Sequence, residues 1–168
     1  PYTRSIAHAA GWQWHIPLQS RTGNGMVYSS VFMQQEQALD TLLQHLPEGE
    51  RSAPKFLRFT TGRRKKQWHK NCLALGLSSG FLEPLESTSL HLIQSGIGRF
   101  LKLFPQNPAD TCLADEFNRQ ADVEMEAIRD FIILHYHLNQ RSEPFWKRCR
   151  EMAVPDTLTE RIALFADS

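Results

Sequence analysis

The sequence has few cysteines, and their spacing gives them no common task. Cys72, Cys112 and Cys149 are odd in number and far apart, and no CxxC pair occurs. This pattern excludes a disulfide framework of the kind that stabilises small secreted domains. We therefore expect a protein of a reducing compartment, the cytoplasm.

Long apolar runs and an excess of charge are also missing. No run approaches the roughly 18 apolar residues that a membrane-spanning helix needs, and the first residues do not read as a secretory signal. The 19 basic and 18 acidic residues leave a net charge of +1. A balance so close to zero gives no global reason to expect a membrane or nucleic-acid partner, and we expect neither.

Several site motifs are absent as well. The sequence contains neither GxxxxGK[ST] nor GxGxxG, so it carries no recognisable phosphate-binding loop. His135 and His137 lie two residues apart in a predicted helix and face different sides, whereas metal pairs on helices stand four apart. We expect no metal site.

The composition is that of a folded domain, with 41% hydrophobic residues over 168 positions. In "GWQWHIPL", Trp12, Trp14 and Ile16 alternate with polar residues, which predicts a strand. "SRTGNG" predicts a turn and "MVYSSVF" a second strand, so the segment is expected to form a hairpin.

Further along, the pattern becomes increasingly helical. A helix is predicted around Leu39–Leu46, a strand with a turn at Gly62, and a buried strand at "CLALGL". Three later helices are predicted. The first has a buried face made of Ile93, Ile97, Phe100, Leu101 and Phe104, and the second covers Phe117–Leu138 with Phe117, Ala121, Ile128 and Ile132 on one side. The third is predicted to start at the capping-box pair Thr157 and Glu160. The expected fold class is α+β, with a mixed part over residues 1–105 and a helical part over residues 106–168.

The segment "GLSSGFLEPLESTSLHL", Gly76–Leu92, has the order strand, small-residue turn and helix. Such a turn lets a backbone approach a ligand closely, and the first N–H groups of a helix suit a small anion. Thr88 and Ser89 could bind a halide there, with Glu86 beside them to accept a proton. A capped helix explains the same residues, and spacing alone favours it.

Two further segments have a functional and a structural interpretation. Trp12 and Trp14 on one strand face could form a rigid aromatic wall, although a core strand is the commoner use of tryptophan. The basic run Gly62–Lys70 could bind phosphates, but a solvated turn and edge strand explain it better at this net charge.

Together, "GWQWHIPLQSRTGNGMVYSS" and "GLSSGFLEPLESTSLHL" resemble the flavin-dependent tryptophan halogenase family. The first matches the WxWxIP signature, and the second matches the segment that carries the catalytic glutamate. "RDFIILHYHLNQRSEPFWKRC" is similar to the helical region of that family. The resemblance runs from Pro1 to about Phe165.

This resemblance implies part of a flavin-monooxygenase-like FAD-binding domain followed by a helical substrate-side segment. In the family, reduced FAD from a separate flavin reductase reacts with oxygen, and halide attacks the resulting flavin hydroperoxide. The hypohalous acid so formed passes through a tunnel to a lysine near the glutamate, where an indole, foremost tryptophan, is chlorinated or brominated. The implied partners are that indole and the reductase, with a homodimer as the assembly.

The resemblance also assigns roles to individual residues. It implies Glu86 as catalytic; Thr88 and Ser89 as halide-binding; Ser79, Gly80, Pro84 and Leu85 as cofactor-binding; and Trp12, Trp14, Ile16 and Pro17 as a barrier between substrate and flavin.

Two features of the family lie upstream of the matched region, namely its GxGxxG motif and its lysine. We therefore expect these residues to be a middle-to-late part of a halogenase that is inactive alone. Two alternatives stay open: a flavin monooxygenase that hydroxylates its substrate, and a non-catalytic fragment or pseudoenzyme that only binds a ligand or partner.

Overall fold

A computed structural model describes residues 2–49, 51–107 and 111–166, with only the backbone of Thr111. The chain divides into two compact units whose segments interleave. Unit 1 comprises Pro1–Leu57 and Leu134–Val154, and unit 2 comprises Arg58–Ile133 and Pro155–Ser168. The two parts expected from the sequence, residues 1–105 and 106–168, include some residues that lie outside the described ones, namely 1, 50, 108–110 and 167–168. The functional division at residue 105 stays a prediction.

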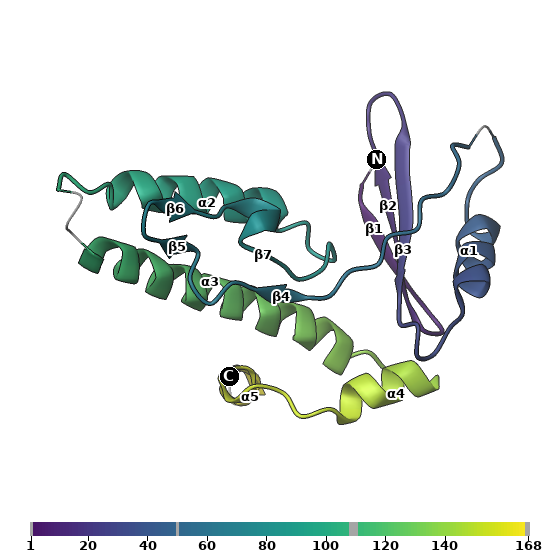
Figure 1. Cartoon of the computed structure of the whole chain (residues 1–168). Helices are drawn as coiled ribbons and strands as arrows, with labels where there is room; N and C mark the ends of the chain where they lie inside the picture. The colour runs from purple at the N-terminus through teal and green to yellow at the C-terminus, as the bar shows by residue number, and fades with distance from the viewer. Residues whose placement is uncertain (1, 50, 108–110, 167–168) are drawn as a thin grey trace. The chain divides into compact units, whose positions relative to one another are not determined.

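Unit 1 contains an antiparallel sheet in the order β1-β2-β3. Its strands are β1 (Arg4–His8), β2 (Gly11–Pro17) and β3 (Thr22–Tyr28), and α1 (Gln35–Gln44) lies beside β3 (Figure 1). The predicted hairpin and the first helix are confirmed. The additional strand β1 places β2 in the middle of the sheet.

The predicted turn at "SRTGNG" is correct only for Ser20 and Arg21, because the rest of that segment belongs to β3. The chain reverses over residues 18–21, where the Leu18 amide donates to the Arg21 carbonyl at 2.8 Å. Gly25 lies directly opposite Trp14, and a Cβ on Gly25 would stand 2.3 Å from the Trp14 ring. This glycine therefore makes room for a tryptophan on the neighbouring strand.

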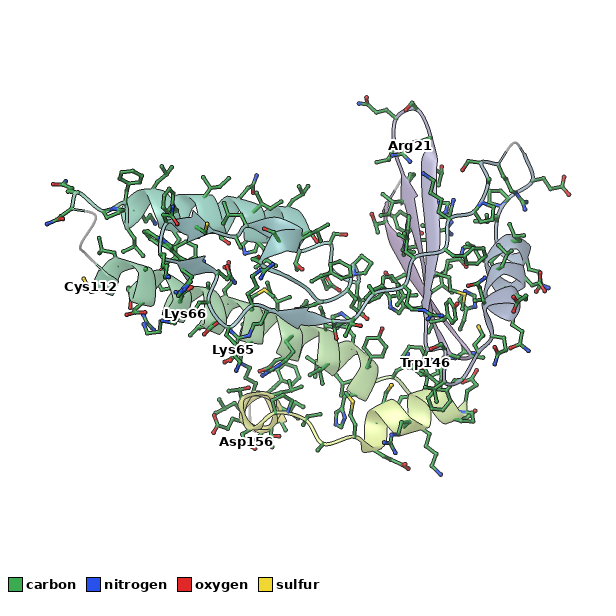
Figure 2. All side chains as sticks on the ribbon, viewed as in Figure 1. Arg21, Lys65, Lys66, Cys112, Trp146 and Asp156 are labelled. Carbon is green, nitrogen blue, oxygen red and sulfur yellow. The ribbon has the colours of Figure 1, made fainter. Side chains whose placement is uncertain are left out.

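Unit 1 is closed by α4 (Pro144–Glu151), whose Trp146 is buried (labelled in Figure 2). The Trp146 indole N–H donates to the His8 carbonyl at 2.6 Å. The buried His8 ring lies 3.0 Å from the Gln13 side-chain oxygen, and its centroid is 4.5 Å from that of His45. His8 of β1 thus contacts β2, α4 and the exposed His45 that follows α1.

Unit 2 places short strands between two helices. The helices are α2 (Ser89–Lys102) and α3 (Thr111–His137), and the last residues of α3 belong to unit 1. Between the helices lie β4 (Gly62–Arg63), β5 (Trp68–His69), β6 (Cys72–Leu73), the 3₁₀ turn Gly76–Ser78 and β7 (Gly80–Phe81) (Figure 1). β4 pairs with β7 and β5 with β6, both antiparallel. The last helix, α5 (Asp156–Ala166), also belongs to this unit.

The core of unit 2 forms around Trp68. Its ring contacts Phe100 of α2 and Phe117 of α3 edge-on, with centroids 5.2 and 5.7 Å away. The buried Asn118 accepts from the amides of Gln67 and Trp68 at 2.8 and 2.9 Å and donates to the Trp68 carbonyl at 2.8 Å. This amide therefore supplies the hydrogen bonds that the short strand would otherwise obtain from a sheet partner.

The predicted buried face of α2 is wrong in part, since Ile97, Leu101 and Phe104 are exposed by 44, 67 and 60%. The face toward α3 is instead partly polar. Glu124 of α3 accepts from Ser95 at 3.0 Å and from Arg99 at 2.7 Å. Charged partners on a neighbouring helix have overridden the apolar periodicity.

The long helix is confirmed, and its predicted residues Phe117, Ala121 and Ile132 are buried. The buried strand predicted at "CLALGL" is wrong: Cys72 is exposed, pairing ends at Leu73, and Gly76 has a φ of +60° that begins a turn.

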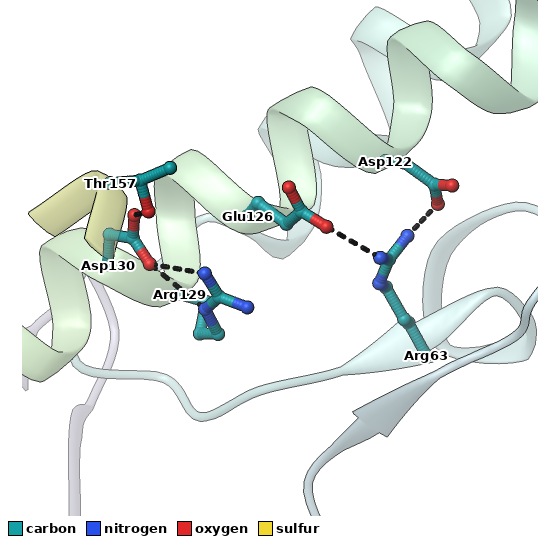
Figure 3. A network of polar contacts seen from close by, with 6 residues as sticks. All are labelled: Arg63, Asp122, Glu126, Arg129, Asp130 and Thr157. Atoms are coloured by element: carbon teal, nitrogen blue, oxygen red, sulfur yellow. Dashed lines mark hydrogen bonds and ion pairs between the residues drawn. The ribbon is translucent and has the colours of Figure 1, made fainter. Parts of the chain in front are cut away.

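The capping box predicted at Thr157 is also wrong. Thr157 lies inside α5 and donates to the buried Asp130 of α3 at 2.5 Å (Figure 3). The Thr157 hydroxyl, which the local pattern assigned to a helix cap, instead bonds Asp130, a residue far away in the sequence.

Among the described residues, every helix is too short or too polar to cross a bilayer.

Replacing Asn118 by Leu should destabilise unit 2. The substitution leaves the amides of Gln67 and Trp68 buried without their acceptor, which we expect to lower the free energy of unfolding by about 2–4 kcal/mol. Thermal or urea unfolding measures the change. Gln94→Leu, at an exposed position of α2, is the control and should unfold like the parent; equal stability of both variants would contradict the role of Asn118.

Burial lowers the pKa of His8 below its ordinary value of 6.5, and His45 and Arg141 act in the same direction, although the hydrogen bond with Gln13 opposes the shift. The unfolded chain therefore takes up this proton at a higher pH than the folded one. Stability from neutral His8 is fully present above pH 6.5 and is lost as the pH falls below that value. Melting temperatures of parent and His8→Gln across this range should differ in slope, and parallel curves would contradict the assignment.

Candidate functional site

The start of α2 carries the two predicted halide-binding residues. Thr88 precedes the helix as its N-cap, but its hydroxyl makes no capping bond, and its carbonyl accepts from the Leu92 amide at 2.9 Å. The first N–H groups of a helix have no partner within it and carry the positive end of its dipole. The backbone at Thr88 and Ser89 is therefore suited to an anion.

Ser87 has a backbone conformation that the sequence did not predict. Its φ is +54°, which is uncommon for a residue other than glycine. A bond from the Ser87 amide to the Pro84 carbonyl at 3.0 Å closes the turn that holds this conformation. Ser87 thus reverses the chain between Glu86 and Thr88, and strain of this kind is concentrated at functional sites.

The turn before β7 is compact because its hydroxyls point back onto it. Ser78 donates to the Leu75 carbonyl and Ser79 to the Gly76 carbonyl, each at 2.7 Å. Ser79 is buried. Its side chain is therefore committed to holding the turn, as is its amide, which donates to the Gly76 carbonyl at 2.9 Å. The cofactor-binding role of Ser79 stays a prediction.

Glycines allow this turn to pack closely against α2. A Cβ on Gly76 would lie 3.1 Å from the Ile93 side chain, and a Cβ on Gly96 would lie 2.8 Å from Leu75. Gly76 also needs its positive φ. The small residues of "GLSSG" thus serve close packing as well as the turn itself.

Between the turn and α2 lies a hollow of about 10 Å³, room for roughly one water-sized particle. The residues around it come from the turn, from β7 and from the start of α2: Gly76, Leu77, Gly80, Phe81, Leu82, Glu83, Thr88, Ser89 and Leu92. The structure therefore brings together Gly80, Thr88 and Ser89, three of the residues predicted for the cofactor and halide.

The predicted catalytic carboxylate lies beside this hollow rather than in its wall. Glu86 is exposed, in the turn that connects β7 with α2. Glu83 lines the hollow, and Pro84 and Leu85 are half-buried between the two carboxylates. The sequence predicted Glu86 beside the anion site, whereas in the structure it is Glu83 that lines the hollow.

The tryptophan strand belongs to unit 1 and is held by contacts that the sequence did not reveal. Trp12 is 3% exposed, and its indole N–H donates to the Tyr136 hydroxyl at 2.9 Å. The Tyr136 ring stacks on Trp146 with centroids 5.6 Å apart. The aromatic residues of "HYHLNQRSEPFW" were the available signal, but their distance along the chain hid the contact.

The other members of the predicted wall differ from Trp12 in exposure. Trp14, Ile16 and Pro17 are half-buried. His15, on the opposite face of β2, contacts the Asn24 side chain at 2.8 Å. The residues that remain accessible in this strand are therefore its second half.

The basic run is engaged with its own unit. Lys66 pairs with Asp115 of α3 at 3.2 Å, Arg63 pairs with Asp122 and Glu126, and Arg64 donates to the turn (Lys65 and Lys66 are labelled in Figure 2). A merely solvated edge is therefore an incomplete interpretation of these residues. Among the described residues, no three His, Cys, Asp or Glu side chains gather as they would around a metal ion.

Comparison with known proteins gives these observations a context. The family model described as tryptophan halogenase matches residues 1–168. Tryptophan 6-halogenase SttH from Streptomyces toxytricini is 40% identical over 164 residues, covering 96% of this chain and 31% of SttH.

Two solved structures are similar in both sequence and fold. BrvH, a flavin-dependent halogenase from Brevundimonas sp. BAL3, is 54% identical with a TM-score of 0.94, over 98% of this chain and 34% of BrvH. Xcc4156, a flavin-dependent halogenase from Xanthomonas campestris, is 51% identical with a TM-score of 0.93, over 98% of this chain and 33% of Xcc4156.

The chain spans about a third of the length of the relatives it matches. The match of the family model extends over the complete sequence, and the mixed α/β fold agrees with the halogenase structures. The chain belongs to the tryptophan halogenase family.

Proposed function

We propose that the protein containing this chain is a flavin-dependent halogenase that chlorinates or brominates an indole, with tryptophan as the first candidate substrate. The observation that carries this proposal is the hollow at the start of α2, which is lined by Gly80 of β7 together with Thr88 and Ser89. A helix start without a side-chain cap, next to an exposed carboxylate, combines an anion site with a proton acceptor.

The residues around the hollow are chemically suited to binding FAD. The turn is compact because its serine hydroxyls are bonded inward, and Pro84 and Leu85 supply half-buried apolar surface for a planar ring. Ser79 and Gly80 would form part of the compact segment against which the flavin packs, and Pro84 and Leu85 would contact the ring. When bound, reduced FAD supplies the electrons with which oxygen converts halide into an electrophile.

The chain's own residues would divide the remaining work. The amides at Thr88 and Ser89 hold the halide through the positive end of α2. Glu86 stabilises the positive charge that develops on the indole ring and takes the proton that leaves it. Its exposed position is compatible with this task, because a base must reach the substrate rather than the halide.

The remaining expectations are part of the same proposal. Trp12, Trp14, Ile16 and Pro17 would keep substrate away from the flavin, as rigid aromatic and apolar surface suits a barrier. A separate flavin reductase would supply reduced FAD in the cytoplasm, and the assembly would be a homodimer. A lysine and a dinucleotide-binding motif of the kind found in the family would come from outside these residues.

Glu86→Gln, made in the complete open reading frame that contains this sequence, should abolish most halogenation. Loss of the proton acceptor and of its charge should lower kcat about 10²–10⁴-fold. The measurement is halogenated indole or tryptophan by mass spectrometry, with reduced FAD, oxygen and halide supplied. Consumption of reduced flavin should continue at the parent rate, since Glu86 acts after the oxidation of halide.

Glu83→Gln is the matched control, because it removes the same charge three positions away and from the wall of the hollow. It should retain more halogenation than Glu86→Gln. Parent-like activity of Glu86→Gln would overturn the assignment of the base, and a hydroxylated product from the parent protein would overturn the proposed function.

A further inference from the structure

The basic segment holds the turn beside the hollow through a pair of bonds from one residue. The Arg64 amide donates to the Ser79 carbonyl at 2.8 Å, and the Arg64 side-chain Nε–H donates to the Ser78 carbonyl at 2.5 Å. Two successive carbonyls of the turn are thus fixed by the backbone and the guanidinium of the same residue. Hydrogen bonds from a charged donor are roughly twice as strong as neutral ones.

The neighbouring Arg63 anchors this contact on α3. Its backbone pairs with Gly80 in the β4–β7 ladder, and its guanidinium pairs with Asp122 and, at 2.9 Å, with Glu126 (Figure 3). A Cβ on Gly80 would stand 3.0 Å from the Arg63 Cα, so the two strands approach closely. The contacts with the long helix α3 therefore hold β4, and through it the turn, in position.

The opposite side of the turn rests on α2, through Gly76 against Ile93 and Leu75 against Gly96. Its serine hydroxyls are occupied by the turn's own carbonyls. The Arg64 side chain accordingly adds a charged hydrogen bond between the basic segment and a turn that also rests on α2. Together with the Arg64 amide and the β4–β7 pairing, this side chain holds the segment that carries Gly80, which lines the hollow with Thr88 and Ser89.

We propose that Arg64 is a positioning residue for the halide and flavin site: through the carbonyls of Ser78 and Ser79 it sets the wall of the hollow opposite the start of α2. This inference rests on the proposed function. It assigns Arg64 no contact with halide, flavin or substrate, and it gives the basic run a role in the enzyme's own site instead of one toward nucleic acid.

The effect of losing the guanidinium follows from the hollow's small size. With room for about one water-sized particle, a small shift of the turn changes how well a halide fits. Binding of halide and flavin should therefore weaken, whereas the proton transfer at Glu86, which lies in the following turn, should change little. The expected signature is a change in KM rather than in kcat.

Arg64→Met in the complete open reading frame tests the proposal, since methionine keeps an apolar side chain and removes the donor. We expect the KM for bromide and the Kd for FAD to rise about tenfold, the equivalent of one charged hydrogen bond, with kcat within about twofold of the parent. Lys65→Met, which removes the neighbouring exposed positive charge, is the control and should leave both constants unchanged.

Each outcome has a defined meaning. Unchanged KM and Kd in Arg64→Met, or equal increases in Lys65→Met, would overturn the positioning role, the latter by showing an effect of net charge. If Arg64→Met does not fold, Arg64→Lys, which keeps the charge but lacks the Nε donor, is judged by the same constants. Failure of the proposed function is separate, because the parent protein would then give no halogenated product.

Discussion

The buried amide of Asn118 is the contact on which the order of unit 2 depends. It satisfies the backbone of Gln67 and Trp68 from the side of α3 and so holds a strand of only two residues in place. Trp68 then fills the space between α2 and α3. The segment that follows, from β6 to the start of α2, can form a strained and compact turn because its entry point is already fixed.

The site built on this frame relies on backbone geometry more than on reactive side chains. Ser87 holds a positive φ, Gly76 another, and the hydroxyls of Ser78 and Ser79 are spent on the turn. A backbone arranged in this way presents N–H groups and close approach to a ligand without side chains in between. Glu86, the proposed proton acceptor, lies exposed in the turn that precedes α2.

The sequence predicted the elements with strong periodicity and the functional segments with distinctive motifs. The hairpin and the long helix follow from apolar spacing, and Thr88, Ser89 and Gly80 lie together as their segment suggested. Contacts between residues far apart in the chain could not be predicted from the sequence. The face of α2 was misjudged because Glu124 pairs with Ser95 and Arg99, and the glycines of β3 were taken for a turn because nothing local indicates that Trp14 lies over Gly25.

Bromide provides the sharpest test of whether the hollow at the start of α2 is a halide site. Crystals of the complete protein soaked in bromide would be measured at the bromine absorption edge. We expect an anomalous peak in the hollow, within hydrogen-bond reach of the Thr88 and Ser89 backbone. Well-ordered density for this segment without a peak there, in a protein that brominates indole, would contradict this expectation.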